Sequence, residues 1–260
     1  MAVRPARPAA GYVGGKRSLS RRLVPMIGAI DHTLYAEPFV GMGGVFLRRD
    51  SRPRCEVIND WSLDVATFFR ILRRHYVPFM DMLRFQLTTR EGFERLMKVE
   101  PDTLTDLERA ARFLYLQRVA YGGKVAGRNF GGQYLGPARF DITRLAPVLE
   151  EVHARLAGVV IERLPYGDFI RRYDRPGTLF FIDPPYFGCE DIYGEGMFSE
   201  ADFERLSGLL EALQGRFILT LGDHPRIRAI FARFDIEPVT LTYRLSGPPT
   251  VGRELIITGP

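Results

Sequence analysis

The chain has 260 residues, of which 46% are hydrophobic and 26% are charged, a composition typical of globular proteins. Its length suits one large α/β domain, or one such domain with an insertion. No apolar run is long enough to span a membrane, and residues 1–10 lack the apolar segment of a signal peptide, so we predict a cytoplasmic protein. The net charge of +5 permits a polyanionic partner without requiring one. Two cysteines, Cys55 and Cys189, are too few for a disulfide framework and lack metal-ligand spacing.

The first motif is a glycine-rich turn, Gly-Tyr-Val-Gly-Gly-Lys, at residues 11–16, and a helix is predicted over residues 18–30. Glycines let the backbone approach a ligand closely, and Lys16 could meet a carboxylate there. Only three of the 36 basic residues are lysines, and two of these, Lys16 and Lys124, follow a Gly-Gly pair. A compact, strongly hydrated charge is therefore favoured at both places, with coincidence and an ordinary capped helix as the alternatives.

A strand, a glycine-rich turn and a short helix are predicted next, over residues 33–36, 37–44 and 45–49. This order is that of the first unit of a nucleotide-binding half, in which the amides that begin the helix face the ligand. The turn is not the Gly-x-Gly-x-x-Gly dinucleotide fingerprint. We therefore expect a ligand that crosses the turn but has no pyrophosphate.

A second strand is predicted over residues 56–58, and it ends in Asn59-Asp60, nineteen residues after Gly41. An acid at this spacing is placed to accept hydrogen bonds from the two ribose hydroxyls of a nucleoside. The alternative is that Asp60 only caps the helix predicted to begin at Leu63.

Residues 63–156 are predicted to be mostly helical, and we interpret them as an insertion in a sheet domain made of residues 1–62 and 157–260. The predicted helices cover residues 63–74, 77–87, 91–98 and 105–120, the last with a capping box at its start.

A glycine-rich loop over residues 121–136 mixes Arg, Lys, Asn and Gln with three aromatic residues. Such a loop suits stacking on bases and hydrogen bonding to their edges. The alternative is a pliable hairpin that its aromatic residues only tether. The candidate nucleic-acid contacts are Arg118, Tyr121, Lys124, Arg128 and Asn129.

The last third of the chain returns to strands and helices, which indicates an α/β class. An acidic stretch at residues 188–196 is interpreted as a lid over the site. The predicted strands cover residues 159–164, 179–182, 216–221, 239–245 and 254–258, and the predicted helices cover residues 199–214 and 224–234. Ser199 and Asp202 form a capping-box pattern at the start of the first of these helices.

The strongest chemical signal is at residues 178–186, Thr-Leu-Phe-Phe-Ile-Asp-Pro-Pro-Tyr. The continuous apolar run predicts a strand that is buried on both faces of a parallel sheet. The two prolines end that strand directly after Asp183, so its carboxylate lies at the carboxyl end of the sheet, where open α/β sheets bind ligands. The alternative is a simple turn in which Tyr186 is an ordinary surface aromatic.

In combination these motifs resemble the Dam-type DNA adenine methyltransferases, in that family's order and over nearly the whole chain. The resemblance implies a Rossmann-like fold that binds S-adenosylmethionine, a helical DNA-recognition insertion, and methyl transfer to the exocyclic amino nitrogen of an adenine in double-stranded DNA. It also implies a monomer that needs no metal. The matching pieces are Gly14-Gly15-Lys16, residues 37–44, Asn59-Asp60, Tyr115-Leu-Gln-Arg118, Asp168-Phe169 and Asp183-Pro-Pro-Tyr186.

The resemblance implies a role for each site residue. Lys16 and residues 37–44 would hold the methionine end of the cofactor, Asp60 its ribose, and Asp168-Phe169 its adenine. Asp183 and the carbonyl of Pro184 would each accept one amino hydrogen of the substrate, and Tyr186 would stack on the flipped base. The implied cofactor-binding residues are Tyr12, Lys16, Glu37, Phe39, Gly41, Gly43, Asp60, Asp168 and Phe169.

One departure concerns the target sequence. Family members that read a defined short site often carry Asn-Gly where this chain has Gly122-Gly123, so no target sequence or restriction partner is assigned, and relaxed specificity stays open. Two other functions also stay open: an RNA adenine methyltransferase, which acts on unpaired bases, and a DNA-binding module that has lost catalysis. Protein-glutamine or cytosine amino methylation is disfavoured, because Asn or Ser commonly replaces the Asp of the motif in those groups.

Overall fold

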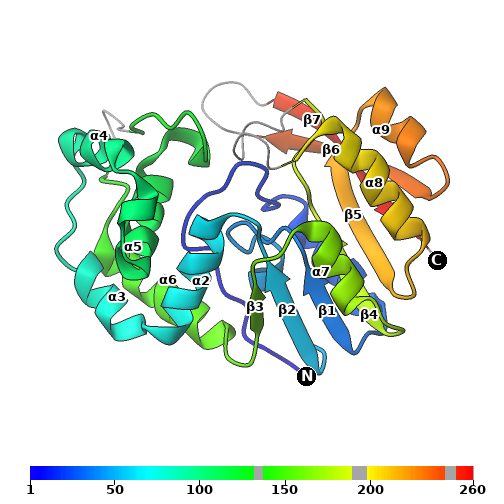
Figure 1. Cartoon of the computed structure of the whole chain (residues 1–260), viewed down its shortest axis with the longest axis horizontal. Coiled ribbons are helices and arrows are strands. Elements are labelled where there is room, and N and C mark those ends of the chain that lie inside the picture. The colour runs from blue at the N-terminus through cyan, green and yellow to red at the C-terminus, as the bar shows by residue number, and fades with distance from the viewer. Residues whose placement is uncertain (132–136, 189–197, 244–249, 260) are drawn as a thin grey trace.

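The computed structural model describes residues 1–131, 137–188, 198–243 and 250–259, and these residues form one mixed seven-stranded sheet with helices on both faces (Figure 1). The strand order is β3-β2-β1-β4-β5-β7-β6, with β7 antiparallel to both its neighbours. The predicted α/β class is therefore confirmed. The strands are β1 (Leu34–Glu37), β2 (Cys55–Asn59), β3 (Val160–Glu162), β4 (Thr178–Ile182), β5 (Arg216–Gly222), β6 (Asp235–Tyr243) and β7 (Thr250–Thr258).

The order of the strands reverses beside β1, since β2 and β3 extend the sheet on one side of it and β4 and β5 on the other. β1 pairs in parallel with both β2 and β4. In open α/β sheets, ligands bind outside the carboxyl ends of the strands at such a point. The fold alone thus indicates a site near Glu37, which ends β1, and Asp183, which follows β4.

Strand β4 is buried along its whole length, as the continuous apolar run predicts. Leu179 and Phe181 pack into one hydrophobic cluster with α1, whereas Phe180 and Ile182 pack into a second cluster with α7, α8 and α9. Burial on both faces fixes the strand firmly and so fixes the position of Asp183 at its end. These helices are α1 (Ser20–Ala29), α7 (Tyr166–Tyr173), α8 (Glu200–Glu211) and α9 (Pro225–Ile230).

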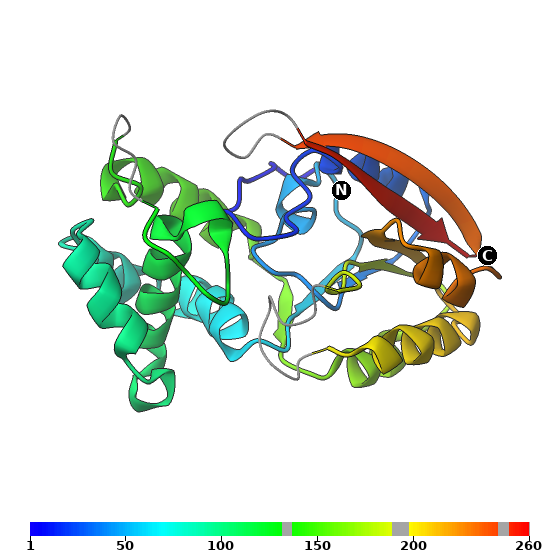
Figure 2. The same cartoon turned by 90° about the horizontal axis from the view of Figure 1, so that it is seen from above.

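The described residues between β2 and β3 form five α-helices, which gather at one end of the molecule while β6 and β7 lie at the other (Figure 2). Phe68 and Leu114 of these helices share a hydrophobic cluster with Tyr35 and Phe181 of the sheet, so the helices pack directly on the sheet. The division of the chain into a catalytic domain and an insertion stays a prediction. The helices are α2 (Leu63–Arg74), α3 (Tyr76–Leu83), α4 (Arg90–Lys98), α5 (Asp106–Val119) and α6 (Ile142–Arg155).

Several predicted elements differ from the structure. Residues 45–49 form only one 3-10 turn, η1 (Phe46–Arg48), and the predicted helix over 224–234 is the shorter α9. Helix α6 lies in the stretch predicted to be mostly helical but outside the individual helices predicted there; it contains Pro147, a residue that argues against a helix interior. Helix α7 is not among the predicted elements. Strand β6 begins before residue 239, and it tolerates Pro238 because it is the edge strand of the sheet.

Two capping boxes are confirmed, at Thr105 with Glu108 and at Ser199 with Asp202. The acidic segment interpreted as a lid falls almost entirely on residues 189–197, which lie outside the described residues. Among the described residues, no helix has both the length and the apolar character that a membrane span requires.

Candidate active site

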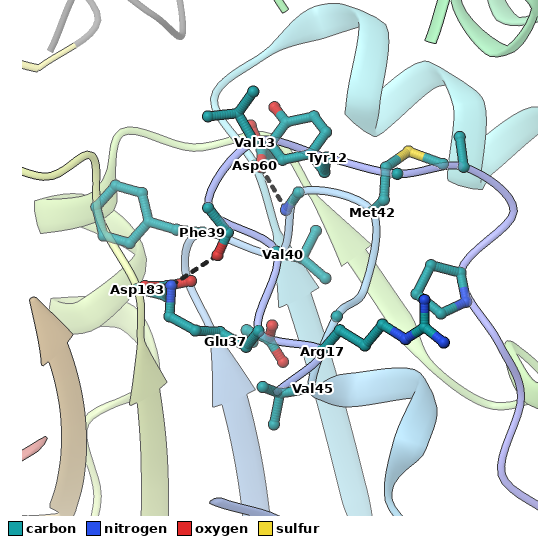
Figure 3. A pocket seen from close by; sticks show the side chains of 18 of the residues that line it. Tyr12, Val13, Arg17, Glu37, Phe39, Val40, Met42, Val45, Asp60 and Asp183 are labelled. Carbon is teal, nitrogen blue, oxygen red and sulfur yellow. Dashed lines mark hydrogen bonds and ion pairs between the residues drawn. The ribbon is translucent and has the colours of Figure 1, made fainter. Parts of the chain in front are cut away.

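A cavity of about 510 Å³ lies at the carboxyl ends of β1 and β4, within the range of about 300–1,000 Å³ usual for cofactor sites. Three segments line most of it: residues 7–17, the turn after β1, and residues 60–62 after β2. Figure 3 shows Tyr12 beside Asp60 in one part of the cavity, and Asp183 on the side of Phe39. Of the predicted site residues, Tyr12, Lys16, Glu37, Phe39, Gly41, Asp60, Arg118 and Asp183 line this cavity.

Asp60 joins the turn after β1 to the start of α2. Its Oδ2 accepts a hydrogen bond of 2.9 Å from the amide of Gly41, and its Oδ1 accepts one of 2.9 Å from the amide of Ser62. Burial raises the pKa of Asp60 to about 6, although both hydrogen bonds act to lower it. Because each carboxylate oxygen has a further lone pair, Asp60 can accept hydroxyl hydrogen bonds from a ligand in the cavity.

Gly41 is glycine for two structural reasons. Its φ of +50° is in the left-handed region, which side chains with a Cβ rarely adopt. A Cβ there would also lie 3.0 Å from Cδ1 and Cε1 of Tyr12. The ring of Tyr12 therefore packs directly on the turn, and together they form one wall of the cavity.

Asn59 stabilises the same turn through hydrogen bonds of its side chain. Its Nδ2 donates to the carbonyl oxygens of Pro38 at 2.9 Å and Leu164 at 3.0 Å, and its Oδ1 accepts from the amide of Leu164 at 2.7 Å. The buried amide is thus fully used in tying the turn after β1 to the end of β3. Asn59 supports the site without lining the cavity.

Glu37 is a buried acid that is 2% exposed. The hydroxyl of Tyr35 donates to its Oε2 at 2.6 Å. Burial raises the pKa of Glu37 to about 8, the charge of Asp183 acts in the same direction, and the Tyr35 hydrogen bond opposes them. Glu37 therefore takes up a proton more readily than an exposed glutamate does.

Asp183 has one carboxylate oxygen engaged and one available. Its Oδ1 lies 2.7 Å from Nζ of Lys16 and accepts a hydrogen bond of 2.8 Å from the hydroxyl of Thr220. In the part of the chain that the structure describes, no hydrogen-bond donor reaches Oδ2. Burial raises the pKa of Asp183, while the neighbouring Lys16 charge acts to lower it.

Lys16 is 4% exposed and also donates to the carbonyl oxygen of Gly14 at 2.7 Å. The glycine-rich turn of residues 11–16 thus delivers a buried cation to the acid at the end of β4. This contact differs from the predicted one, in which Lys16 meets a carboxylate of the ligand.

The ring of Tyr186 lies next to the same cation, with Nζ of Lys16 4.7 Å from the ring centroid. Its hydroxyl donates to Oε2 of Glu254 at 2.7 Å. The sequence did not indicate Thr220 or Glu254 as site residues. The one available signal was the charged Glu254 at the start of the apolar run Leu-Ile-Ile.

The comparison with known proteins decides the family. The model of the D12 class N6 adenine-specific DNA methyltransferase matches residues 12–245. The chain belongs to this family. It is therefore an N6-adenine DNA methyltransferase, and its family uses S-adenosylmethionine as the methyl donor. The family and the activity predicted from the sequence are confirmed.

Three relatives are similar over most of this chain. The type II methyltransferase M.CviBI of Paramecium bursaria Chlorella virus NC1A is 21% identical over 86% of this chain and 86% of its own length. The type II methyltransferase M1.LlaDCHI of Lactococcus lactis subsp. cremoris is 23% identical over 97% of this chain and 95% of its own length. The DNA N-6-adenine-methyltransferase of Escherichia phage P1 is 28% identical over 78% of this chain, which is 28% of its own length.

Two residues predicted to bind the cofactor do not lie on the cavity of this methyltransferase. Asp168 and Phe169 are consecutive on helix α7, so their side chains point about 100° apart. Phe169 is fully buried against the sheet, whereas Asp168 is exposed and pairs with Arg171 at 2.7 Å. A contact between these two residues and the adenine of the cofactor stays a prediction.

Three further predicted residues are near the cavity without lining it, namely Gly43, Pro184 and Tyr186. Gly43 has a φ of +76°, and a Cβ there would lie 2.8 Å from Cγ of Leu47. The absence of a side chain at Gly43 thus lets the turn after β1 pack closely against Leu47 of η1.

The predicted DNA contacts of this methyltransferase fall into two groups. Tyr121, Lys124 and Asn129 are exposed. Arg118 and Arg128 are partly buried and donate to groups of the protein itself: Arg118 to the carbonyl oxygens of Ala9 and Arg139, and Arg128 to that of Lys124. Residues 132–136 of the predicted loop lie outside the described residues.

Proposed function

We propose that this enzyme methylates an adenine flipped out of duplex DNA, with the amino nitrogen held by Asp183 and the methyl donor bound in the adjoining cavity. We base this proposal on the hydrogen bonding of the two carboxylate oxygens of Asp183. Lys16 and Thr220 engage its Oδ1, and no donor in the described part of the chain engages its Oδ2. A partly buried carboxylate oriented in this way presents one acceptor to a substrate that brings a donor.

The residues around the cavity fit S-adenosylmethionine. Asp60 would hold the ribose hydroxyls, and Glu37 with the turn after β1 would hold the methionine end. The wall formed by Tyr12 and Gly41 would pack on the body of the molecule. When bound, the cofactor supplies a methyl group activated by a positively charged sulfur. The contacts of Lys16 give it another role, because its charge lowers the pKa of Asp183 against the opposing effect of burial.

The amino nitrogen of adenine is a weak nucleophile because its lone pair is conjugated with the ring. In the proposed mechanism Oδ2 of Asp183 and the carbonyl oxygen of Pro184 each accept one amino hydrogen, which directs the lone pair away from the ring. The nitrogen would then attack the methyl carbon in line as the methyl–sulfur bond breaks, so that the sulfur keeps the bonding electron pair and S-adenosylhomocysteine is the leaving group. The nitrogen would give up one proton, for which Asp183 is the acceptor. Alignment of the reacting atoms contributes several kcal/mol, and the proposed mechanism uses no metal ion.

The target base must leave the helix to reach Asp183, at a cost of a few kcal/mol in pairing and stacking. Tyr186 would stack on the extruded base, which is worth about 1–3 kcal/mol. The proline pair before Tyr186 stiffens the backbone that carries it. The stacking therefore offsets a large part of the cost of flipping.

The proposed role of Asp60 gives a pH dependence. Only the ionised carboxylate can accept both ribose hydroxyls, and burial raises the pKa of Asp60 to about 6. We expect the affinity for sinefungin, a stable analogue of the cofactor, to fall up to about tenfold per pH unit below pH 6. Calorimetry from pH 5 to pH 8 measures this. Asp60→Asn should bind sinefungin weakly, and its affinity should not fall further below pH 6. If the affinity of Asp60→Asn falls below pH 6 as it does in the wild type, another group is responsible for the pH dependence.

We propose that the helices between β2 and β3, with the loop that begins at residue 121, recognise DNA. The loop is fastened to the glycine-rich turn at residues 11–16 by Gln117, which is 1% exposed. Its Nε2 donates to the carbonyl oxygens of Gly11 at 2.9 Å and Gly123 at 2.6 Å, and its Oε1 accepts from Arg128 at 3.2 Å. The side chain of Gln117 thus connects the proposed DNA-binding loop to the segment that carries Lys16.

Gln117→Leu is expected to raise the KM for duplex DNA about tenfold, because it removes the side-chain donor to the carbonyl of Gly11 and one of the two donors to the carbonyl of Gly123. Thr88→Val is the matched control, since Thr88 makes a comparable tie to Phe140 elsewhere in the same helical region, at 3.0 Å. Steady-state assays on plasmid DNA compare the two variants. Equal effects of both substitutions would mean that Gln117 serves stability alone.

We further propose that the enzyme acts as a monomer in the cytoplasm, where it meets the nucleoid. Sedimentation of the protein with and without a DNA duplex tests the oligomeric state. A second subunit on one target site would contradict this part of the proposal.

A further inference from the structure

The buried carboxylate of Glu254 contacts Tyr186, the residue proposed to stack on the flipped base. Glu254 is 5% exposed and is followed in β7 by Leu255, Ile256 and Ile257, which are all buried. A buried acid in an apolar strand is unfavourable unless a specific partner compensates for the lost hydration. One such partner is Tyr186, whose hydroxyl donates to Oε2 at 2.7 Å.

Strand β5, which is next to β7, has a glycine where it contacts the ring of Tyr186. In the register of the sheet, Gly222 of β5 pairs with Glu254 of β7. A Cβ at Gly222 would lie 3.3 Å from Cδ2 of Tyr186, which is closer than most real Cβ contacts. The missing side chain thus lets the Tyr186 ring lie across the end of β5 with its hydroxyl directed at Glu254.

The third neighbour of the ring is a cation. Nζ of Lys16 lies 4.7 Å from the ring centroid of Tyr186 and 2.7 Å from Oδ1 of Asp183. Lys16 is therefore shared between the stacking residue and the catalytic acid. The charge of Glu254 also acts on Asp183, where it raises the pKa.

We propose that Glu254 is a positioning residue that fixes the Tyr186 ring in the orientation that stacks on the flipped adenine. The inference rests on the proposed role of Tyr186 in base stacking. A ring held at its hydroxyl by Glu254, along one edge by Gly222 and near its face by Lys16 has little rotational freedom to lose when a base arrives. Preorganisation of this kind strengthens binding by lowering the entropy cost.

A double-mutant cycle tests this inference, with Tyr186→Phe as the second substitution. Glu254→Leu is expected to raise the KM for DNA about tenfold and to change kcat by less. Glu254→Gln keeps an acceptor of the same shape and should restore most of the affinity. In the Tyr186→Phe background, Glu254→Leu should change the KM less than about twofold, because the hydroxyl that it serves is already gone.

The base-flipping signal gives an independent readout. The target site is first mapped by long-read sequencing of plasmid DNA treated with the wild-type enzyme, and 2-aminopurine then replaces the target adenine in a duplex. The wild type should raise the fluorescence of the probe, and Glu254→Leu should raise it several-fold less. If the wild type shows no methylation or flipping, the proposed function fails; if it flips the base and Glu254→Leu flips it equally well, only this inference fails.

If Glu254→Leu does not fold, Gly222→Ala provides a second test. The added methyl group displaces the Tyr186 ring and leaves Glu254 intact, so it should reproduce the loss of fluorescence and the rise in KM. Glu237→Gln is the matched control, because Glu237 is an exposed acid on the neighbouring strand β6 that pairs with Arg22. Wild-type behaviour of Gly222→Ala, or a defect in Glu237→Gln as large as that in Glu254→Leu, would overturn the inference.

Discussion

Replacing Asp183 by Ala is expected to lower kcat by about 10³-fold, while the dissociation constant of the cofactor changes only a few fold. The reason is that Oδ2 of Asp183 serves the substrate, whereas Asp60 and the turn after β1 hold the cofactor. Asp183→Asn is the more conservative form of the test, since it keeps the size of the side chain and removes its charge. A tritiated-methyl assay beside calorimetry with sinefungin measures both quantities.

The control for this prediction is Asp223→Asn. Asp223 follows β5 as Asp183 follows β4, but it pairs with Arg228 at 2.6 and 2.9 Å and does not line the cavity. Asp223→Asn should therefore turn over substrate at a rate close to that of the wild type. Near-normal turnover in Asp183→Asn, or a loss of cofactor binding as large as the loss of rate, would refute the proposed mechanism.

Replacing Glu56 by Ala is expected to lower the free energy of unfolding by about 3–5 kcal/mol. Glu56 is 3% exposed on β2, and it pairs with Nη1 of Arg49 at 2.8 Å and with Nη2 of Arg155 at 2.7 Å. The substitution leaves two buried guanidinium groups without their shared counter-ion. Because Arg155 ends α6, the pair also fastens the end of the helical region to the sheet.

Urea denaturation followed by circular dichroism measures this loss. Glu204→Ala is the control, because Glu204 pairs with Arg226 at the surface, where the two side chains are 60% and 47% exposed. Exposed pairs contribute little to stability, so this control should change the free energy of unfolding by less than about 0.5 kcal/mol. A Glu56→Ala protein as stable as the control would show that the buried network does not secure the fold.

The features that the sequence predicts well are local ones. The strand before Asp183 follows from an uninterrupted apolar run and two adjacent prolines, and the starts of α5 and α8 follow from capping boxes within four residues. Helix α2 runs from Leu63 to Arg74 as predicted. In each case the residues that determine the structure are neighbours in the chain.

The partners of the site residues depend on long-range packing, and for that reason the sequence alone does not reveal them. Tyr186 and Glu254 are 68 residues apart, and Gln117 and Gly11 are 106 residues apart; they meet only because the sheet and helices assemble. The assignment of Lys16 to the cofactor shows the same limit, since its nearest acid comes from β4. Phe169 was assigned to the cofactor, but it lies on a helix that the sequence did not reveal, and this helix directs its side chain into the core.

Identifying the methylated nucleoside shows which base this enzyme modifies. The purified enzyme is incubated with S-adenosylmethionine that carries a deuterated methyl group, together with equal amounts of unmethylated duplex DNA and structured RNA, and the digested nucleosides are analysed by mass spectrometry. We expect deuterated N6-methyldeoxyadenosine with the wild type and at most a trace with Asp183→Ala. Label on RNA adenosine or on cytosine, with none on deoxyadenosine, would refute adenine methylation of DNA at the Asp183 site.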